Sequence, residues 1–441
     1  MSKILFINPW ITDFTAYNLW IKPLGLLYIM SIVKDFGIDI EFIDCINHNL
    51  AIKKEKSDGT FFINSFEIKK PDMFKNIPRK FKCFGIPIDL FKNELEKVKK
   101  IDAVFITSMM TYWYPGIQMV IEIVREKLGN SIPIVIGGVY ATLMPNHAKK
   151  LGVDLVIEGE AENKVDEVLN KILGTKFLKK YNDINTIPFP YFKALDNKKI
   201  LPFMTSRGCP YKCSYCGSFL LTSFRERSLE NIITELEFIK KNYNTEHIAF
   251  YDDALLLNKE KRIKPLLQEI IKRGINFQFH TPNGLHINSI DEELIQLMKK
   301  SGFKTIRLSM ESNNQDFLKK TNSLHKISNI EKVIKTMIQA GYTKSQISVY
   351  ILVGLPDQEP EEIEDAIKYI GSLNIKTSLS YFSPVPGTLE YKKMKEKHLI
   401  PENEDPLIHN KIVFPYFWSK ITPDKLENIK NIQHNLNSKT I

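Results

Sequence analysis

The sequence lacks the features that mark secreted and membrane proteins. Five cysteines in 441 residues are too few and too unevenly placed for a disulfide framework, and their odd number fits a reducing cytoplasm. No run reaches the roughly 18 uninterrupted apolar residues that a membrane span needs. The first residues, MSKILFINPW, contain no small-residue cleavage site. We therefore expect a cytoplasmic protein with no membrane span.

Acidic residues are outnumbered by basic ones, 51 to 61, which gives a formal net charge of +10. A basic balance of this kind can favour an acidic partner such as RNA. The lysines are nevertheless spread over expected helix faces, as in KVKK and KEKRIK. This pattern favours a solvated surface, and we expect no nucleic-acid partner.

Strands alternate with helices in the first half of the chain, a pattern typical of parallel sheets with helical crossovers. Residues 46–88 show little periodicity and are interpreted as an insertion. The pattern predicts an α/β domain over residues 1–175 with a flavodoxin-like or Rossmann-like, doubly wound parallel sheet. Its expected strands are 3–8, 39–44, 102–107, 132–137 and 153–159.

The alternation restarts after residues 176–200, which contain two prolines and are interpreted as a linker. The six strand–helix units that follow are fewer than a closed TIM barrel contains. The pattern predicts a partial (β/α)6 TIM-like barrel over 201–395 and a short helical tail over 396–441. The expected strands of the barrel are 201–206, 247–253, 276–281, 305–311, 347–354 and 375–382.

Three of the five cysteines lie within eight residues, in the stretch SRGCPYKCSYCGS (206–218). Zinc usually takes four ligands, often from two Cys-x2-Cys pairs, and no second pair or nearby histidine is present. A [4Fe–4S] cluster usually takes four cysteines, so three would leave one iron open to a substrate or cofactor. The loop is rich in Pro, Lys, Ser and Gly, which argues against three buried, metal-free thiols. We therefore predict an iron–sulfur cluster on Cys209, Cys213 and Cys216.

This cysteine motif, with the aromatic Tyr215 before its last cysteine and a barrel strand before it, resembles the radical S-adenosylmethionine (SAM) superfamily. The resemblance implies that the open iron of the cluster chelates SAM. It also implies reductive cleavage of SAM to methionine and a 5′-deoxyadenosyl radical, with an electron donor such as flavodoxin or ferredoxin. In such enzymes the cofactors carry the hard chemistry, and the protein orients and shields them.

Later strand ends carry residues that match SAM-binding positions of that family. Asp252 and Asp253, in FYDD, are matched to the methionine amino group, which a carboxylate suits by charge. Glu311, in RLSMES, is matched to a position near the ribose. Gly354, in VYILVGLPDQ, is matched to the adenine contact, where a missing side chain permits close backbone approach. The alternatives are a surface turn for the two aspartates and a solvated charge for Glu311.

The stretch NFQFHTPNGLHIN (276–288) supplies the candidate catalytic residues, His280 and His286. Both could line a substrate cavity at the carboxyl ends of the barrel strands, where barrel active sites form. The alternative is a turn at residues 282–284 with hydrogen-bonded histidines. We expect a small-molecule or natural-product substrate, which the sequence does not name.

The first half of the chain resembles the cobalamin-binding domain that precedes the radical SAM core in one subclass. The features are INP after the first strand, PLGLLYI in the first helix, and IGGVYATLMP (136–145) after the fourth strand. The resemblance implies that Gly137 and Gly138 let the backbone approach the nucleotide tail, with the hydroxyls of Thr107 and Ser108 nearby. A plain strand-to-helix turn is the alternative for the two glycines.

One motif of some cobalamin proteins is absent from this half. It is Asp-x-His-x-x-Gly, whose histidine ligates cobalt from below, and no lower ligand is predicted here. Tyr112, Trp113 and Tyr114 are the aromatic candidates for the corrin face. All three are equally ordinary packing residues.

The main functional hypothesis is a cobalamin-dependent radical SAM enzyme that methylates an unactivated carbon. A radical SAM cyclase or rearrangement enzyme is one alternative. A tRNA methylthiotransferase is another, but it carries three N-terminal cysteines, where only Cys45 and Cys83 are available here. A sensor that binds its cofactors without turnover is the non-enzymatic alternative.

Overall fold

A computed structural model describes residues 2–18, 20–56, 59–323 and 329–440. The chain forms two compact units, one of Met1–Pro202 with Asp405–Leu407 and one of Phe203–Glu404 with Ile408–Ile441. The expected linker at 176–200 packs within the first unit. There, Ser31 Oγ donates a hydrogen bond to Phe189 O at 2.5 Å, and the rings of Phe36 and Phe177 stack at 4.5 Å.

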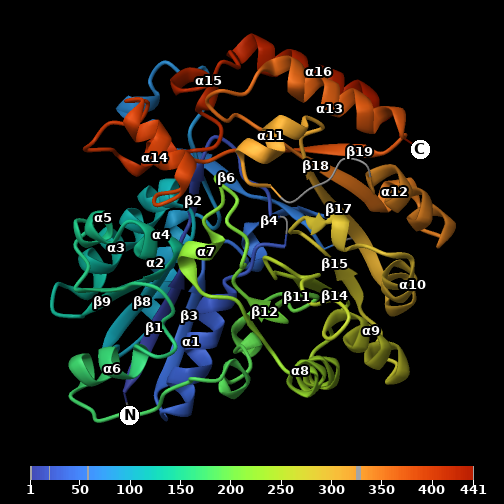
Figure 1. Ribbon diagram of the computed structural model, residues 1–441. Helices are drawn as coiled ribbons and strands as arrows, with labels where there is room; N and C mark the ends of the chain where they lie inside the picture. Colours follow the sequence, from blue (N-terminus) through green and yellow to red (C-terminus); the bar gives the residue numbers. More distant parts are fainter. Residues whose placement is uncertain (1, 19, 57–58, 324–328, 441) are drawn as a thin grey trace. The chain divides into compact units, whose positions relative to one another are not determined.

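Five parallel strands form the main sheet of the first unit, in the order β10–β9–β8–β1–β3 (Figure 1). β1 pairs in parallel with both β3 and β8, so the winding of the chain reverses beside β1. Such a reversal opens a crevice at the carboxyl ends of the strands. This order confirms the predicted flavodoxin-like sheet. Its strands are β1 (Lys3–Asn8), β3 (Asp39–Asp44), β8 (Ala103–Ser108), β9 (Ile134–Gly138) and β10 (Leu155–Ile157).

Both faces of this sheet are buried, because successive side chains of a strand point to opposite faces. Leu5 and Ile7 of β1 join a core cluster with α2 (Ile88–Lys97) and α3 (Tyr114–Leu128). Ile4 and Phe6 are equally buried. α1 (Leu24–Asp35) also packs against β1 and β3. The continuous apolar run of β1 is explained by this double burial.

The insertion at 46–88 contains short antiparallel strands that its sequence did not indicate. β7 pairs with both β2 and β6, and β4 pairs with β5. Strands of three or four residues are too short to show a period of two, and β7 depends on a partner far along the chain. β2 (Ile11–Asp13) precedes the insertion, and the strands within it are β4 (Ile52–Glu55), β5 (Phe61–Ile63), β6 (Ser65–Glu67) and β7 (Lys82–Phe84).

A second sheet contains six strands in sequence order, and the short β16 (Leu285–His286) adds to β17. Its first strand, β11, begins in residues of the first unit, and the strands from β14 to β19 pair in parallel within the second unit. Among the strands that the structure describes, no pairing joins β11 to β19, as expected for a partial barrel. Parallel order places all the strand-end loops at one edge, where barrel active sites form. The strands are β11 (Ile200–Phe203), β14 (His247–Phe250), β15 (Gln278–His280), β17 (Phe303–Glu311), β18 (Ile347–Val353) and β19 (Lys376–Tyr381).

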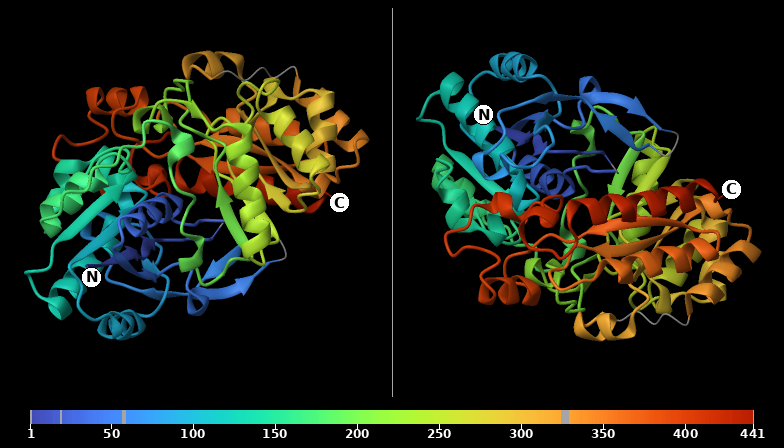
Figure 2. Two further views of the ribbon diagram at one scale, coloured as in Figure 1. Left: turned by 90° about the horizontal axis from the view of Figure 1, so that it is seen from below. Right: turned by 90° about the horizontal axis from the view of Figure 1, so that it is seen from above.

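The tail ends in α15 (Phe414–Phe417) and α16 (Pro423–Ser438). α16 lies alongside α13 (Pro360–Ser372), as Figure 1 and the right view of Figure 2 show. The helices approach closely at Gly371, where an added Cβ would lie 2.9 Å from a methyl group of Leu436. None of the helices in the described ranges is both long and apolar enough to cross a membrane.

Candidate active site

The cysteine loop leaves the carboxyl end of β11 and leads to α8 (Leu229–Asn242). Its two ends are joined by β12 (Ser206–Arg207), which pairs antiparallel with β13 (Arg225–Glu226). Gly208 adopts φ 72°, and a Cβ there would lie 2.7 Å from Thr222 O and 2.8 Å from Ser223 O. Only glycine combines that backbone angle with so close an approach. Gly208 therefore allows the loop to close.

The three thiols lie close enough for each to influence the ionisation of another. Burial raises the pKa of the Cys209 thiol to about 11 and that of Cys213 to about 12. A metal centre offsets this cost, since metals bind the thiolate. Among the described residues, no group of three or more His, Cys, Asp or Glu side chains is arranged so that it could hold a single metal ion. A cluster does not require this, because each cysteine ligates a different iron.

The backbone of the cysteine loop is held by segments that follow two other strands. Ser214 N donates to Thr321 O at 2.9 Å, and Asn322 Nδ2 donates to Lys212 O at 3.0 Å. Both partners come directly after α11 (Gln315–Lys320), which follows β17. From the loop after β19, Glu390 N in α14 (Leu389–Glu396) donates to Ser214 O at 3.0 Å. The loop is therefore fixed by two separate parts of the barrel.

The adjacent aspartates Asp252 and Asp253 after β14 differ in their surroundings. Asp252 is fully buried and accepts hydrogen bonds from Thr205 N, Thr205 Oγ1 (2.6 Å) and Ser206 Oγ (2.6 Å). Its carboxylate is therefore engaged at the start of the cysteine loop. Asp253 instead accepts a hydrogen bond from Ser218 Oγ at 3.1 Å, two residues beyond Cys216. Burial raises the pKa of Asp253. Of the two predicted positions, Asp253 is the one beside the cysteines.

Glu311 ends β17 in a conformation that is rare for a residue with a side chain, with φ 69°. The pairing of β17 with β18 shifts register between Ser309 and Glu311. Such irregularities re-aim a side chain, and they concentrate at functional sites. Burial and the neighbouring Glu311 carboxylate both raise the pKa of Tyr215, and the thiol of Cys213 lies beside them. The structure thus brings Glu311 to the cysteine loop, as the sequence predicts for a shared site.

Gly354 follows β18 with φ 103° and is closely approached, though by a part of the chain that the sequence did not indicate. A Cβ there would lie 3.0 Å from the ring of Phe414. Gln358 Oε1 accepts from Gly354 N at 2.8 Å, and Trp418 Nε1 donates to Gly354 O at 3.1 Å. The tail therefore covers this glycine, and no signal in the strand pattern could reveal that long-range contact.

The two candidate catalytic histidines occupy different environments. His280 is fully buried, and its Nε2 and Nδ1 lie 2.9 Å from His247 Nδ1 and Thr305 Oγ1. This arrangement matches the hydrogen-bonded alternative. His286 is partly exposed and packs edge-on against Tyr211 of the cysteine loop, with 5.0 Å between ring centroids. Of the two, His286 is the one at the loop.

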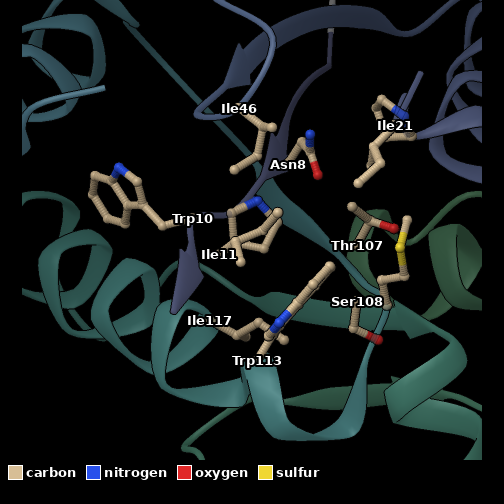
Figure 3. A pocket seen from close by; sticks show the side chains of 12 residues that line it. Asn8, Trp10, Ile11, Ile21, Ile46, Thr107, Ser108, Trp113 and Ile117 are labelled. Atoms are coloured by element: carbon tan, nitrogen blue, oxygen red, sulfur yellow. The ribbon is translucent and has the colours of Figure 1, made fainter. Parts of the chain in front are cut away.

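In the first unit, a pocket of about 50 Å³ lies at the carboxyl ends of β1 and β8, beside the reversal of the sheet. Figure 3 shows its walls, with Asn8 coming from β1 and Thr107 from β8. Among the described residues that line it, none is a histidine. The lining is mainly apolar with a few polar atoms, as is usual for cofactor pockets. The side chains labelled there are Asn8, Trp10, Ile11, Ile21, Ile46, Thr107, Ser108, Trp113 and Ile117.

Four residues predicted for cobalamin lie together at this edge of the sheet. Ser108 Oγ donates to Gly137 O at 2.8 Å and accepts from Ala141 N at 3.2 Å, so it fixes the turn after β9. Gly138 has φ 103°, and a Cβ there would lie 2.3 Å from Ser108 O. Thr107 lines the pocket beside Ser108. The glycine thus permits close packing of β8 on β9 next to the pocket.

Of the three aromatic candidates, Trp113 is the one that lines the pocket. Its Nε1 donates to Asp13 Oδ2 at 3.0 Å, which fixes the ring against β2. Tyr112 is buried, and Tyr114 donates to Asp405 Oδ2 at 3.0 Å. Sequence reasoning missed Ile21 and Ile46, since apolar residues in loops carry no periodic signal. The apolar wall and the hydroxyls are groups of the kinds that line cofactor pockets, and among the described lining residues there is no imidazole for cobalt.

Two families match the chain, one for each unit. Residues 203–370 match the radical SAM superfamily, and residues 91–169 match the B12 binding domain. An uncharacterized methyltransferase of Pyrococcus horikoshii is 27% identical over 345 residues, which cover 69% of this chain and 72% of that protein. Bacteriochlorophyllide d C-12(1)-methyltransferase of Chlorobaculum tepidum is 25% identical over 292 residues, 62% of each chain. The chain thus spans less than two thirds of the second relative.

Solved structures show the same fold. The radical SAM methyltransferase TsrM from Kitasatospora setae, with tryptophan and a SAM analogue bound, has a TM-score of 0.68 at 14% identity. The match covers 99% of this chain and 89% of that one. Another structure of TsrM contains cobalamin and a [4Fe–4S] cluster, with a TM-score of 0.64 at 16% identity and coverage of 92% and 80%. The chain therefore combines a region that matches the radical SAM superfamily with a region that matches the B12 binding domain, the two domains of the subclass that its sequence resembles.

Proposed function

We propose that this protein is a cobalamin-dependent radical SAM methyltransferase that methylates an unactivated carbon of a small molecule. The observation that carries the proposal is the presence, in one chain, of two prepared sites. The second unit gathers three thiols with Asp253 and Glu311, and the first unit forms a pocket at the switch point of its sheet. The methyltransferase names of the two curated relatives support the same activity.

In the second unit, Cys209, Cys213 and Cys216 would hold the cluster as thiolates. Asp253, which lies near Cys216 through Ser218, offers a carboxylate to the ammonium group of SAM. Glu311 faces the same loop, and its carboxylate accepts a hydrogen bond from a hydroxyl of the SAM ribose. When bound, the cluster supplies the electron that cleaves SAM, and cobalamin supplies the methyl group that is transferred. The chain keeps the cysteine loop in place through Thr321, Asn322 and Glu390.

In the first unit, Thr107 and the glycine turn receive the nucleotide tail of cobalamin. Trp113, whose ring orientation is fixed by Asp13, gives a flat apolar wall that suits a macrocycle. Asn8 offers the amide at the carboxyl end of β1, although Asp44 Oδ1 accepts from its Nδ2 at 2.7 Å. Among the described residues that line the pocket there is no histidine, so the lining would offer no imidazole to cobalt.

The remaining parts of the proposal concern partners and place. An external low-potential donor, such as flavodoxin or ferredoxin, delivers the electron, and the substrate is a small molecule. A reducing cytoplasm is the suitable location, since the three cluster cysteines must be reduced to bind iron.

The test is anaerobic reconstitution with iron, sulfide and cobalamin, followed by gel filtration and incubation with SAM and reductant. We expect corrinoid absorption to remain with the protein, and both 5′-deoxyadenosine and S-adenosylhomocysteine to form. Failure to retain cobalamin would exclude the proposal. Formation of 5′-deoxyadenosine alone, under conditions that retain cobalamin, would favour the cyclase or rearrangement alternative.

The iron content separates the proposal from the methylthiotransferase alternative. One cluster corresponds to about four irons per chain, and a second would bring the count to about eight. Cys45 and Cys83 are fully buried in the first unit, and burial raises the pKa of both thiols. We therefore expect the lower count.

A further inference from the structure

Four exposed lysines of the second unit lie in the cysteine loop or in two segments that are hydrogen-bonded to it. Lys212 lies in the loop itself, between two cluster cysteines. Lys319 and Lys320 end α11, and Lys392 lies in α14. We call these four residues the lysine surface.

Backbone hydrogen bonds bring these separate segments together. The residues directly after Lys320 contact the loop, through Thr321 O to Ser214 N at 2.9 Å and Asn322 Nδ2 to Lys212 O at 3.0 Å. α14 contacts the same point, through Glu390 N to Ser214 O at 3.0 Å. Segments after β17 and β19 therefore meet on either side of one residue of the loop.

The charge of the lysine surface is largely uncompensated. Within the part of the chain that the structure describes, Lys212, Lys320 and Lys392 take part in no ion pair. Lys319 lies 3.9 Å from Asp316, and both side chains are about four-fifths exposed, at 78% and 80%. An exposed pair at that distance neutralises little. The nearby Glu390 is already paired with a fifth lysine, Lys393, at 2.8 Å.

The lysine surface also includes a residue that neighbours a cluster ligand in the chain. Lys212 directly precedes the buried Cys213, and the exposed Pro210 directly follows Cys209. Two cluster ligands are therefore each one residue from solvent. A surface that is both positive and adjacent to the cluster combines steering with a short transfer path.

We propose that the lysine surface is the docking site of a small, acidic one-electron carrier protein that reduces the cluster. The inference rests on the proposed function, in which each reductive cleavage of SAM consumes one electron. In the docking step the carrier loses one electron and the cluster gains it, and no covalent bond forms or breaks. Complementary charge raises the association rate with such a carrier.

The test compares two reductants on the reconstituted full chain. One is reduced flavodoxin of net negative charge, and the other is excess dithionite with methyl viologen, whose radical is a small cation. The variant is Lys320→Glu with Lys392→Glu. Its matched control is Lys332→Glu with Lys335→Glu, which changes two exposed lysines of α12 (Ile330–Gln339) on the helix that packs against α10 (Glu292–Ser301). The readout is the rate of 5′-deoxyadenosine formation at several flavodoxin concentrations.

We expect the first variant to raise the KM for flavodoxin about tenfold at low ionic strength, with the viologen-driven rate unchanged. The control variant should leave the flavodoxin-driven and viologen-driven rates unchanged. Added salt should lower the flavodoxin-driven rate of the unaltered protein, because salt screens the attraction between the two proteins. Three outcomes would overturn the docking site. They are an equal loss of the flavodoxin-driven rate in variant and control, no loss of that rate in either, and a loss of the viologen-driven rate in the variant as well. No SAM cleavage by the unaltered protein with viologen would instead overturn the proposed function, and this inference with it.

Discussion

Arg262 shows how a single buried charge organises the start of the cysteine loop. Its guanidinium donates to Thr205 Oγ1, to Ala254 O at 3.0 Å and to Leu255 O at 2.6 Å, and it lies 3.6 Å from Asp252 Oδ1. The arginine thus joins the end of β11 to the loop after β14. Asp252 and its neighbour Asp253 consequently have different roles, although the two residues are of the same type.

Substitution of each aspartate by asparagine separates these tasks. Asp252→Asn removes the buried carboxylate that accepts hydrogen bonds from Thr205 and Ser206, while Arg262 keeps Glu226 as an ion-pair partner at 3.4 Å. We therefore expect a loss of about 2 kcal/mol in the free energy of unfolding, as for lost hydrogen bonds to a charged group. Asp253→Asn removes a carboxylate that burial already disfavours, so stability should change little while the KM for SAM rises. Urea unfolding and SAM-cleavage kinetics measure the two effects. Equal destabilisation by both changes would contradict the assignment.

Gly138 and Gly137 form a second matched pair. Gly138→Ala places a Cβ 2.3 Å from Ser108 O at φ 103°, whereas the Cβ of Gly137→Ala has Ile157 Cβ at 3.7 Å as its nearest neighbour. We expect Gly138→Ala to cost about 2 kcal/mol or more in stability and to weaken cobalamin retention. Gly137→Ala should leave stability nearly unchanged. Denaturant unfolding and corrinoid absorption after gel filtration give the comparison.

Lys22 gives the first unit a pH-dependent stability. It is 2% exposed, and burial lowers its pKa from 10.5 to about 8, although Asp44 and Asp196 oppose the shift. Between pH 8 and 10.5 the unfolded chain binds more protons at this residue than the folded chain, so its unfavourable contribution fades as the pH rises. Below pH 8 the full cost of about 3 kcal/mol is present.

The variant Lys22→Met isolates this effect from the other titrating groups. Its stability relative to the unaltered protein should be highest near pH 7 and should fall steadily as the pH rises from 8 to 10. The measurement is urea unfolding of both proteins at each pH. A difference in stability that is independent of pH would show that Lys22 titrates normally.

At the scale of elements, the cysteine loop depends on the short pair β12–β13 that closes it. Gly208→Ala would bring a Cβ within 2.7 Å of Thr222 O and would strain the backbone at φ 72°. We expect this change to separate the ends of the loop and to lower the iron content after reconstitution by at least about half, since backbone strain of this kind costs about 1–3 kcal/mol. Gly274→Ala, where φ is 59° but no atom lies within 4 Å of the added Cβ, is the control for backbone strain alone. Iron analysis and cluster absorption of the reconstituted Gly208→Ala and Gly274→Ala proteins provide the comparison.

Sequence periodicity predicted the long elements and missed the short ones for a physical reason. All five strands of the main first sheet and all six of the barrel were expected, because buried parallel strands form continuous apolar runs. The pairing of β2, β6 and β7 was not, since three-residue strands take their stability from distant partners. Contacts such as Phe414 on Gly354 are equally invisible in local sequence.

At the scale of the whole molecule, each unit has its own buried core and its own site. Units of this kind can keep their structure independently. The triple variant Cys209→Ala, Cys213→Ala, Cys216→Ala should therefore lose iron and 5′-deoxyadenosine formation while it retains cobalamin. Iron analysis and corrinoid absorption of the same gel-filtered sample test this. Loss of both cofactors would show that the first site depends on the cluster.

The sequence by itself determined the kinds of chemistry, because these depend on residue identity and spacing. Cys-x3-Cys-x2-Cys implies a cluster with an open iron, and two sets of strand–helix units imply two parallel sheets. Only the tertiary structure decided which residues meet. It placed Asp253 at the cysteines and Asp252 with Arg262, His286 at the loop and His280 inside the sheet, and Trp113 in the pocket. These outcomes depend on contacts between residues far apart in the chain, whose geometry no local pattern encodes.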